Sequence, residues 1–205
     1  MIQKWIEKTP YVLIYLRLIL GLMIIPLSYF KVDNYVGISI VFLSIGLLSD
    51  VFDGIIARKL NISTVKLRRL DSSIDVVFFL SFAVATYLQC PDYFALRSTE
   101  LIIIVALEAL TYLVCFIKFK KEIATHSIGA KIWTILMFAT LVEIIFTCHS
   151  SYLFYIFFIV GIITRLEIVA IILVLKKWTN DVPSIFDAIN FRKGKPIKRH
   201  KMFNG

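Results

Sequence analysis

Six apolar runs, each long enough to cross a lipid bilayer as a helix, dominate the sequence. A transmembrane helix needs about 20 consecutive and mostly apolar residues to span the hydrocarbon core. The chain of 205 residues is 59% hydrophobic, which is more apolar than soluble domains are. We therefore predict an all-α integral membrane protein with six transmembrane helices. The predicted spans are Tyr11–Phe30, Tyr35–Ala57, Asp71–Leu88, Ser98–Ile117, Ile132–Thr147 and Tyr152–Leu175.

The segments outside these spans are short, so we expect a single membrane domain over residues 1–205, with the six-helix core at residues 10–175. Residues 1–9 place Trp5 among charged and apolar side chains, a pattern shared by interfacial amphipathic helices and by frayed termini. Residues 176–205 form a basic tail, which suits either a solvated cytoplasmic end or contact with anionic lipid.

Positive charge is distributed unevenly over the two sides of the predicted membrane domain. The formal net charge is +9, and lysines and arginines favour the cytoplasmic side of transmembrane helices. If the N-terminus is inside, Lys31 and Arg97 are the only basic residues between the spans that lie on the outer side. We therefore expect both termini in the cytoplasm. We reject nucleic-acid binding, because the basic residues separate apolar spans and form no recognisable reader module.

The three cysteines, Cys90, Cys115 and Cys148, are far apart in the sequence and lack the spacing of metal ligands. Buried cysteines commonly act as small apolar side chains. We therefore expect all three to be packing residues.

Four aspartates stand at the ends of two neighbouring spans. Asp50 and Asp53 lie three residues apart at the end of the second apolar run, and Asp71 and Asp75 lie four apart at the start of the third. On a helix, both spacings put the pair on one face, one turn apart. A short basic loop between the helices would bring the pairs together at the membrane boundary. Carboxylates so close need counter-charge, which hard divalent cations such as Mg²⁺ supply while taking oxygen ligands.

The two carboxylate pairs belong to a longer pattern of fixed spacings, Asp50-x-x-Asp53-Gly54-x-x-Ala57-Arg58 followed by Asp71-x-x-x-Asp75. This pattern resembles the signature of the CDP-alcohol phosphotransferase (CDP-alcohol phosphatidyltransferase) family, integral membrane enzymes of phospholipid biosynthesis. The resemblance implies transfer of a phosphatidyl group from a CDP-linked lipid such as CDP-diacylglycerol. The acceptor is the hydroxyl of a small alcohol, and CMP is released.

The resemblance also implies roles for individual residues. Asp50, Asp53, Asp71 and Asp75 would bind two Mg²⁺ or Mn²⁺ ions, and Asp75 would also take the proton of the acceptor hydroxyl. A base near other carboxylates and partly desolvated has a raised proton affinity, which suits this role. The nucleotide and diphosphate of the donor would contact Asp50, Gly54, Ala57, Arg58 and Leu67.

Three positions depart from the family pattern. Leu67 stands where the family has a glycine, four residues before the third aspartate. In the first span, Tyr11 and Ile14 occupy positions where family members often carry asparagine and threonine upstream of an arginine, here Arg17. We therefore expect the metal-and-base centre to follow the family while some nucleotide contacts differ.

The acceptor is less well defined than the donor. Lys131 follows Ser127 and Gly129 in a stretch similar to a family motif, and as a point charge it suits an acceptor phosphate. It is equally explained as one more lysine on the cytoplasmic side. Glycerol 3-phosphate is therefore the first expectation for the acceptor, and a plain alcohol such as inositol or serine is the alternative.

Two arginines lie within predicted spans, where charge is costly and often functional. Arg165, with Glu167 in the same span, would bind the acceptor head group or form a structural ion pair, in which Arg165 would pair with Glu143 or Glu108 and Glu167 with Arg17. Arg17 has a similar choice between a site carboxylate and a structural pair.

We expect this protein in a bacterial inner membrane, with the carboxylates facing the cytoplasm. The family resemblance further implies a homodimer surrounded by membrane lipids. Two other interpretations remain open. One is an ion channel or transporter whose intramembrane carboxylates bind the permeating ion. The other is a catalytically inactive relative of the family.

Overall fold

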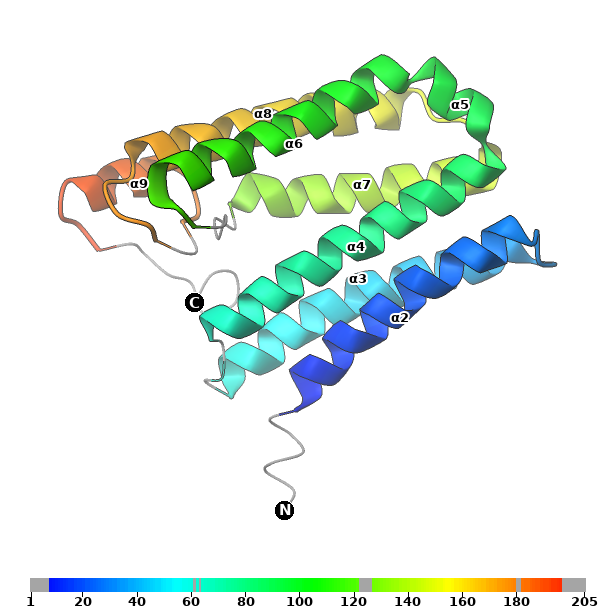
Figure 1. Cartoon of the computed structure of the whole chain (residues 1–205), viewed down its shortest axis with the longest axis horizontal. Coiled ribbons are helices and arrows are strands. Elements are labelled where there is room, and N and C mark those ends of the chain that lie inside the picture. The colour runs from blue at the N-terminus through cyan, green and yellow to red at the C-terminus, as the bar shows by residue number, and fades with distance from the viewer. Residues whose placement is uncertain (1–7, 61, 63, 122–126, 180–181, 197–205) are drawn as a thin grey trace. The chain divides into compact units, whose positions relative to one another are not determined.

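The computed structural model describes residues 8–60, 62, 64–121, 127–179 and 182–196. Within these residues all regular secondary structure is helical, and six helices are long and apolar enough to cross a membrane. They are α2 (Thr9–Tyr29), α3 (Tyr35–Lys59), α4 (Val65–Gln89), α6 (Ser98–Phe119), α7 (Ile128–Thr147) and α8 (Tyr152–Val174) (Figure 1). Two shorter helices are α5 (Pro91–Leu96) and α9 (Ile185–Arg192). The predicted all-α membrane fold with six spans is confirmed.

The start of α4 differs from the prediction. The hydropathy of the chain places the third span at Asp71, but the helix begins at Val65 because Thr64 caps it. The Thr64 hydroxyl accepts a hydrogen bond from the Leu67 backbone N–H at 3.2 Å, which satisfies one of the amides left open at a helix start. The basic residues before Asp71 therefore lie on the first turns of α4 and not in a loop.

The two ends of the chain are described in part. The predicted interfacial helix at residues 1–9 lies outside the described residues except for Lys8 and Thr9. The basic tail contains α9, which was not predicted. The Ser184 hydroxyl accepts a hydrogen bond from the Asp187 backbone N–H at 3.3 Å and so caps this helix.

The described helices fall into two compact units. The first comprises residues 1–95 and 141–150, and the second comprises residues 96–140 and 151–205. Helix α7 therefore contributes its last turns to the first unit and its earlier turns to the second.

In the first unit, α2 packs along both α3 and α4, whereas α3 and α4 contact each other little. Figure 1 shows these three helices running side by side. Phe78 of α4 is fully buried, and the close approach of its ring depends on Gly21 of α2 and Gly46 of α3. A Cβ atom at Gly46 would overlap the Phe78 ring. This packing sets the distance between the helices that carry the aspartates.

At the end of the first unit opposite the aspartates, polar contacts join α2 to α4. The Ser28 hydroxyl donates a hydrogen bond to the Ala85 carbonyl at 2.6 Å, and the Gln89 amide donates one to the Ser28 carbonyl at 2.7 Å. A disulfide between Cys90 and Cys148 lies at the same end. The expectation that all three cysteines are packing residues is therefore wrong for this pair, while Cys115 is buried with its thiol intact.

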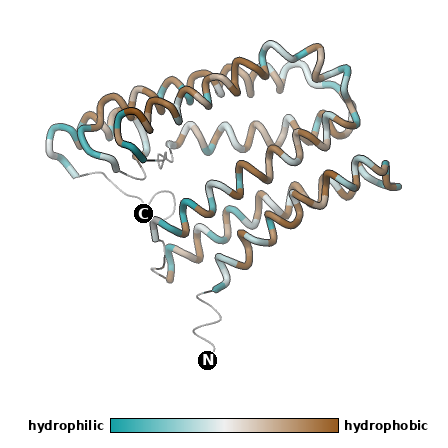
Figure 2. The backbone as a smooth tube through the Cα atoms, in the orientation of Figure 1, coloured by the Kyte–Doolittle hydropathy of each residue, from teal (hydrophilic) through white to brown (hydrophobic). Residues whose placement is uncertain are grey.

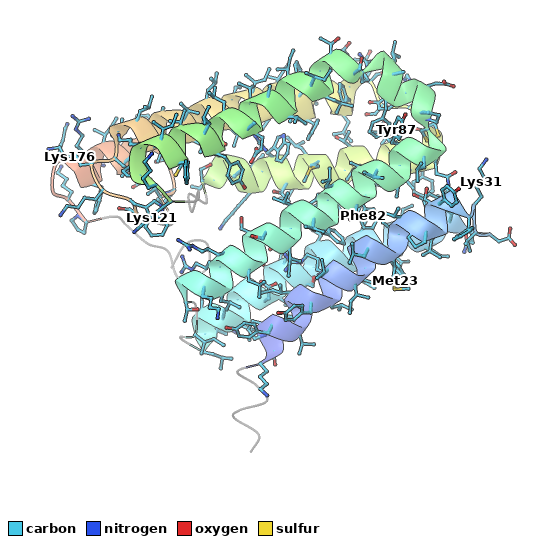
Figure 3. The ribbon with its side chains drawn as sticks, in the orientation of Figure 1. Met23, Lys31, Phe82, Tyr87, Lys121 and Lys176 are labelled. Atoms are coloured by element: carbon cyan, nitrogen blue, oxygen red, sulfur yellow. A yellow bond between two sulfur atoms is a disulfide. The ribbon has the colours of Figure 1, made fainter. Side chains whose placement is uncertain are left out.

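In the second unit, α6 and α8 run parallel. The Arg97 guanidinium before α6 donates a hydrogen bond to the Tyr155 hydroxyl at 2.7 Å, and at the other end the Lys118 ammonium reaches the Leu173 carbonyl at 2.7 Å. Lys121 and Lys176 lie just beyond the ends of these two helices (Figure 3). Figure 2 shows the same trend in both units, with apolar residues along the helices and hydrophilic residues at helix ends.

Candidate active site

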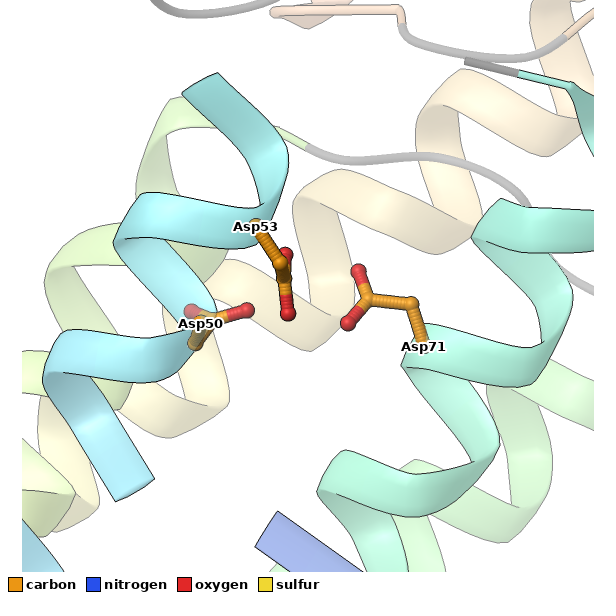
Figure 4. Close-up of side chains that lie close together, drawn as sticks. All are labelled: Asp50, Asp53 and Asp71. Carbon is orange, nitrogen blue, oxygen red and sulfur yellow. The ribbon is translucent and has the colours of Figure 1, made fainter. Parts of the chain in front are cut away.

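The four aspartates predicted to form the site lie together at one end of the first unit. Asp50 and Asp53 are on the last turns of α3, and Asp71 and Asp75 are on the first half of α4. Figure 4 shows the carboxylates of Asp50, Asp53 and Asp71 pointing toward one another from these two helices. The spacings of three and four residues put each pair on one helix face, and helix packing turns the two faces together.

The carboxylate geometry suits a divalent cation. One oxygen from each of Asp50, Asp53 and Asp71 lies within 4.8 Å of the others. Oxygen ligands of Mg²⁺ or Ca²⁺ lie about 2.0–2.6 Å from the ion, so ligands on opposite sides are about 4–5 Å apart. Asp75 is not a member of this group of three and lies one turn further along α4. The three oxygens therefore fit one metal ion without rearrangement of the helices.

The four carboxylates differ in how far they are exposed. The Asp53 side chain is 3% exposed, whereas the Asp50 side chain is 36% exposed. Asp71 and Asp75 are intermediate, at 23% and 29%. Asp50 and Asp75 are therefore the more accessible carboxylates of the four, and Asp53 is the most enclosed.

Arg17 of α2 lies at the centre of the four carboxylates. Its Nη1 atom is 3.3 Å from Asp50 Oδ1 and 3.2 Å from Asp71 Oδ1. The same guanidinium forms ion pairs with Asp53 and Asp75. The Arg17 side chain is 1% exposed, so the carboxylates provide the counter-charge that a buried guanidinium requires.

The sequence left open whether Arg17 pairs with a site carboxylate or forms a structural ion pair elsewhere. In the structure it pairs with the site carboxylates. It was not among the predicted site residues. The available signal was its charge inside an apolar span, which is expensive without a partner. Which residue that partner is depends on how α2 packs between α3 and α4.

The residues predicted to contact the nucleotide differ in accessibility. Gly54 lies under the Arg58 side chain, because a Cβ atom added at Gly54 would be 3.3 Å from Arg58 Nη1. Arg58 is half-buried on the same turn of α3. Ala57 and Leu67, in contrast, are buried, with 4% and 3% of their surface exposed.

Two of the three departures from the family pattern meet in space. Ile14 of α2 and Leu67 of α4 belong to one buried apolar cluster, which also contains Ala57 and Ile74. Tyr11, one turn before Ile14, is 38% exposed. Apolar side chains therefore fill the region beside the motif where the family pattern has small or polar residues.

The two residues predicted to bind the acceptor lie in the second unit. Lys131 is exposed on the first turn of α7. Arg165 is buried, donates a hydrogen bond from Nε to Glu108 at 2.7 Å, and stacks its guanidinium over the Trp133 ring at 3.6 Å. Of the partners considered for Arg165, the structure selects Glu108. Glu143 accepts a hydrogen bond from the Ser150 hydroxyl at 2.5 Å in the first unit.

Comparison with known families agrees with the geometry of the site. The family model described as CDP-alcohol phosphatidyltransferase matches residues 7–166, which include α2, α3, α4 and all four aspartates. No curated protein and no solved structure matched the chain. Because the matched region covers most of the 205 residues, and because the signature carboxylates converge as a metal site requires, this chain belongs to the CDP-alcohol phosphatidyltransferase family.

Proposed function

We propose that this protein is a metal-dependent enzyme that transfers the phosphatidyl group of CDP-diacylglycerol to glycerol 3-phosphate. Membership of the family supports transfer of a phosphatidyl group from a CDP-alcohol in phospholipid biosynthesis. The observation that carries the metal dependence is the convergence of Asp50, Asp53 and Asp71, with one oxygen of each within 4.8 Å of the others.

The carboxylates would hold Mg²⁺ or Mn²⁺, and two ions are proposed from the family resemblance. Such ions screen the diphosphate charge and stabilise the leaving phosphate of CMP. Asp50, Asp53 and Asp71 are the proposed ligands, and Asp75 would complete the set from the next turn of α4. Arg58, half-buried beside Gly54, is placed to pair with an oxygen of the donor diphosphate.

Asp75 is the proposed general base. It would accept the proton from the acceptor hydroxyl as the hydroxyl oxygen forms a bond to the β-phosphorus of the donor. The bond between that phosphorus and the bridging oxygen breaks, and CMP leaves with the electron pair. The 29% exposure of the Asp75 side chain leaves its carboxylate within reach of an acceptor, and base catalysis of this kind commonly contributes about 10²–10⁴-fold.

The buried residues Ala57 and Leu67 would shape the nucleotide pocket and not contact water. With Leu67 packed on Ile14, the base and ribose of the donor would rest on an apolar surface. Asp50, Gly54 and Arg58 would then provide the polar contacts of the donor.

Glycerol 3-phosphate is favoured as the acceptor because Lys131 follows Ser127 and Gly129 in a stretch similar to a family motif. Lys131 is exposed and suits a phosphate as a point charge. Arg165 already pairs with Glu108, so a contact with an acceptor would have to share that guanidinium. The homodimer implied by the family resemblance stays a prediction.

Release of CMP tests this function directly. We expect purified full-length protein with Mg²⁺ and radiolabelled CDP-diacylglycerol to release CMP on addition of glycerol 3-phosphate, and not on addition of inositol or serine. Chelation of the metal is expected to stop the release. Turnover with inositol or serine alone would refute the acceptor assignment, and no CMP with any acceptor would refute the enzyme.

We further propose that the carboxylate end of the first unit faces the cytoplasm of a bacterial inner membrane and that both termini lie there. Two independent features support this orientation. The first is the basic excess on the predicted inner side. The second is the disulfide between Cys90 and Cys148, because disulfides persist in oxidising compartments such as the periplasm. Cys90 follows the end of α4, which at a rise of about 1.5 Å per residue is about 28 Å along the helix from Asp71.

Cysteine labelling in cells tests the orientation. In a variant without the three native cysteines, Lys31→Cys puts a single thiol between α2 and α3, and Lys59→Cys puts one at the last residue of α3. A membrane-impermeant maleimide is expected to label Lys31→Cys in intact spheroplasts and Lys59→Cys only after lysis. The reverse pattern would show that the carboxylates face the periplasm.

A further inference from the structure

The Arg17 guanidinium forms ion pairs with all four carboxylates of the site. It is also anchored from a second direction, since Nε lies 3.4 Å from the Ser49 hydroxyl oxygen. That hydroxyl donates a hydrogen bond to the Gly46 carbonyl at 2.7 Å, so its oxygen is left to accept from Arg17. The guanidinium is therefore held by α3 and α4 together, while its own helix α2 packs along both.

We propose that Arg17 is the resident counter-cation of the metal site, which holds the four carboxylates together before metal binds and opposes the metal when it enters. This inference rests on the metal-dependent function proposed above. It assigns to Arg17 a positioning role in the assembly of the site, exerted through its contacts with the proposed metal ligands and with Asp75.

The charge balance of the site supports this role. Four carboxylates from two helices would repel each other in an apolar surrounding, and one guanidinium reduces their formal charge from −4 to −3 when all are ionised. The remaining negative charge still attracts a divalent cation. The N–H donors of a guanidinium are spread over separate nitrogens and reach carboxylates on different sides, whereas those of a lysine ammonium lie on a single nitrogen.

The same contacts imply competition with the metal. Arg17 pairs with the three carboxylates whose oxygens form the candidate metal ligand group. A metal ion bound to those oxygens would lie close to the guanidinium, and two positive charges a few ångströms apart repel strongly in a site of low effective dielectric constant. Metal affinity is therefore weaker with Arg17 in place than without it, and the stability of the metal-free protein is greater.

Substitution of Arg17 by methionine separates these two effects. In the purified full-length protein without substrate, we expect Arg17→Met to lower the Kd for Mn²⁺ by at least about tenfold, because the repulsion is removed. The melting temperature of the metal-free variant is expected to lie at least about 3 °C below that of the metal-free wild type. Addition of Mn²⁺ is expected to raise the melting temperature of the variant by more than it raises that of the wild type. Binding is measured by electron paramagnetic resonance of Mn²⁺ and melting by intrinsic fluorescence.

Arg165→Met is the matched control. Arg165 is the other arginine buried in a span, at 5% exposure, and it pairs with Glu108 in the second unit. We expect this variant to melt at a lower temperature with a Kd for Mn²⁺ within about twofold of the wild type. A change of Mn²⁺ affinity in Arg165→Met as large as that in Arg17→Met would overturn the assignment, because the effect would then not be local to the carboxylates.

Weaker or unchanged Mn²⁺ binding in Arg17→Met would overturn the proposal, since Arg17 would then only support the metal ligands or be irrelevant to them. Arg17→Lys covers the case in which Arg17→Met does not fold. Lysine keeps the charge but cannot reach all four carboxylates, so it opposes the metal less than arginine does. We therefore expect a Kd for Mn²⁺ below that of the wild type but above that of a site without a counter-cation. A Kd at or above that of the wild type contradicts the proposal. A wild-type protein that binds no Mn²⁺ would refute the proposed metal-dependent function itself, a result distinct from failure of the Arg17 assignment.

Discussion

Replacement of Asp75 by asparagine is expected to lower CMP release by about a thousandfold, within the range of about 10²–10⁴ that general-base catalysis contributes. Asparagine has nearly the shape of aspartate but cannot accept the proton of the acceptor hydroxyl. Asp75 lies outside the group of three carboxylates that fits one cation, so the Kd of the Mn²⁺ ion held by those three is expected to change by no more than a few fold. Single-turnover release of CMP measures the first effect, and Mn²⁺ titration measures the second.

The control for this variant is Asp92→Asn. Asp92 is exposed at the start of α5 in the same unit, away from the carboxylate pairs on α3 and α4. We expect Asp92→Asn to release CMP at the wild-type rate. If Asp75→Asn kept more than a tenth of wild-type turnover, Asp75 would not be the base. If it lost Mn²⁺ binding to the same degree as activity, its main role would be that of a metal ligand.

Asp50→Asn is expected to act on metal binding itself. We predict a rise in the Kd for Mn²⁺ of at least about a hundredfold, since changes to outer-shell partners of metal ligands already cost about 10–100-fold. Turnover at low metal concentration is expected to fall in parallel and to recover in part as Mn²⁺ is raised. Asp50 is the most exposed of the four carboxylates, at 36%, so the substitution disturbs packing least.

The pair Asp50→Asn and Arg17→Met also tests the charge balance of the site. Removal of one carboxylate and removal of the guanidinium act in opposite directions on Mn²⁺ affinity, and the two groups are in contact. We therefore expect non-additive changes in the double variant, as is usual for contacting residues. Equal Mn²⁺ affinity in the wild type and Asp50→Asn would contradict the ligand role of Asp50.

The apolar cluster beside the motif gives a physical meaning to the departures from the family pattern. In the sequence, Ile14 and Leu67 are separate exceptions in two different spans. In the structure they fill one space together with Ala57. The larger Leu67 side chain packs in the same buried cluster as the apolar Ile14. The two departures are therefore explained as one change in packing.

The sequence by itself determined the number and approximate bounds of the six long helices, because hydropathy and helix length are properties of consecutive residues. It also determined that each aspartate pair occupies one helix face, because spacings of three and four residues are set by the helical repeat. The family signature then indicated which carboxylates would converge.

Only the tertiary structure decided which distant side chains meet. The pairing of Arg17 with the four carboxylates, of Arg165 with Glu108, and of Cys90 with Cys148 depends on how helices far apart in the chain pack. Hydropathy contains no information on the direction in which a polar side chain inside an apolar helix points. The start of α4 at Val65 also depends on the Thr64 hydroxyl, which accepts a hydrogen bond from the Leu67 backbone N–H, and a window of average hydropathy cannot detect such a cap.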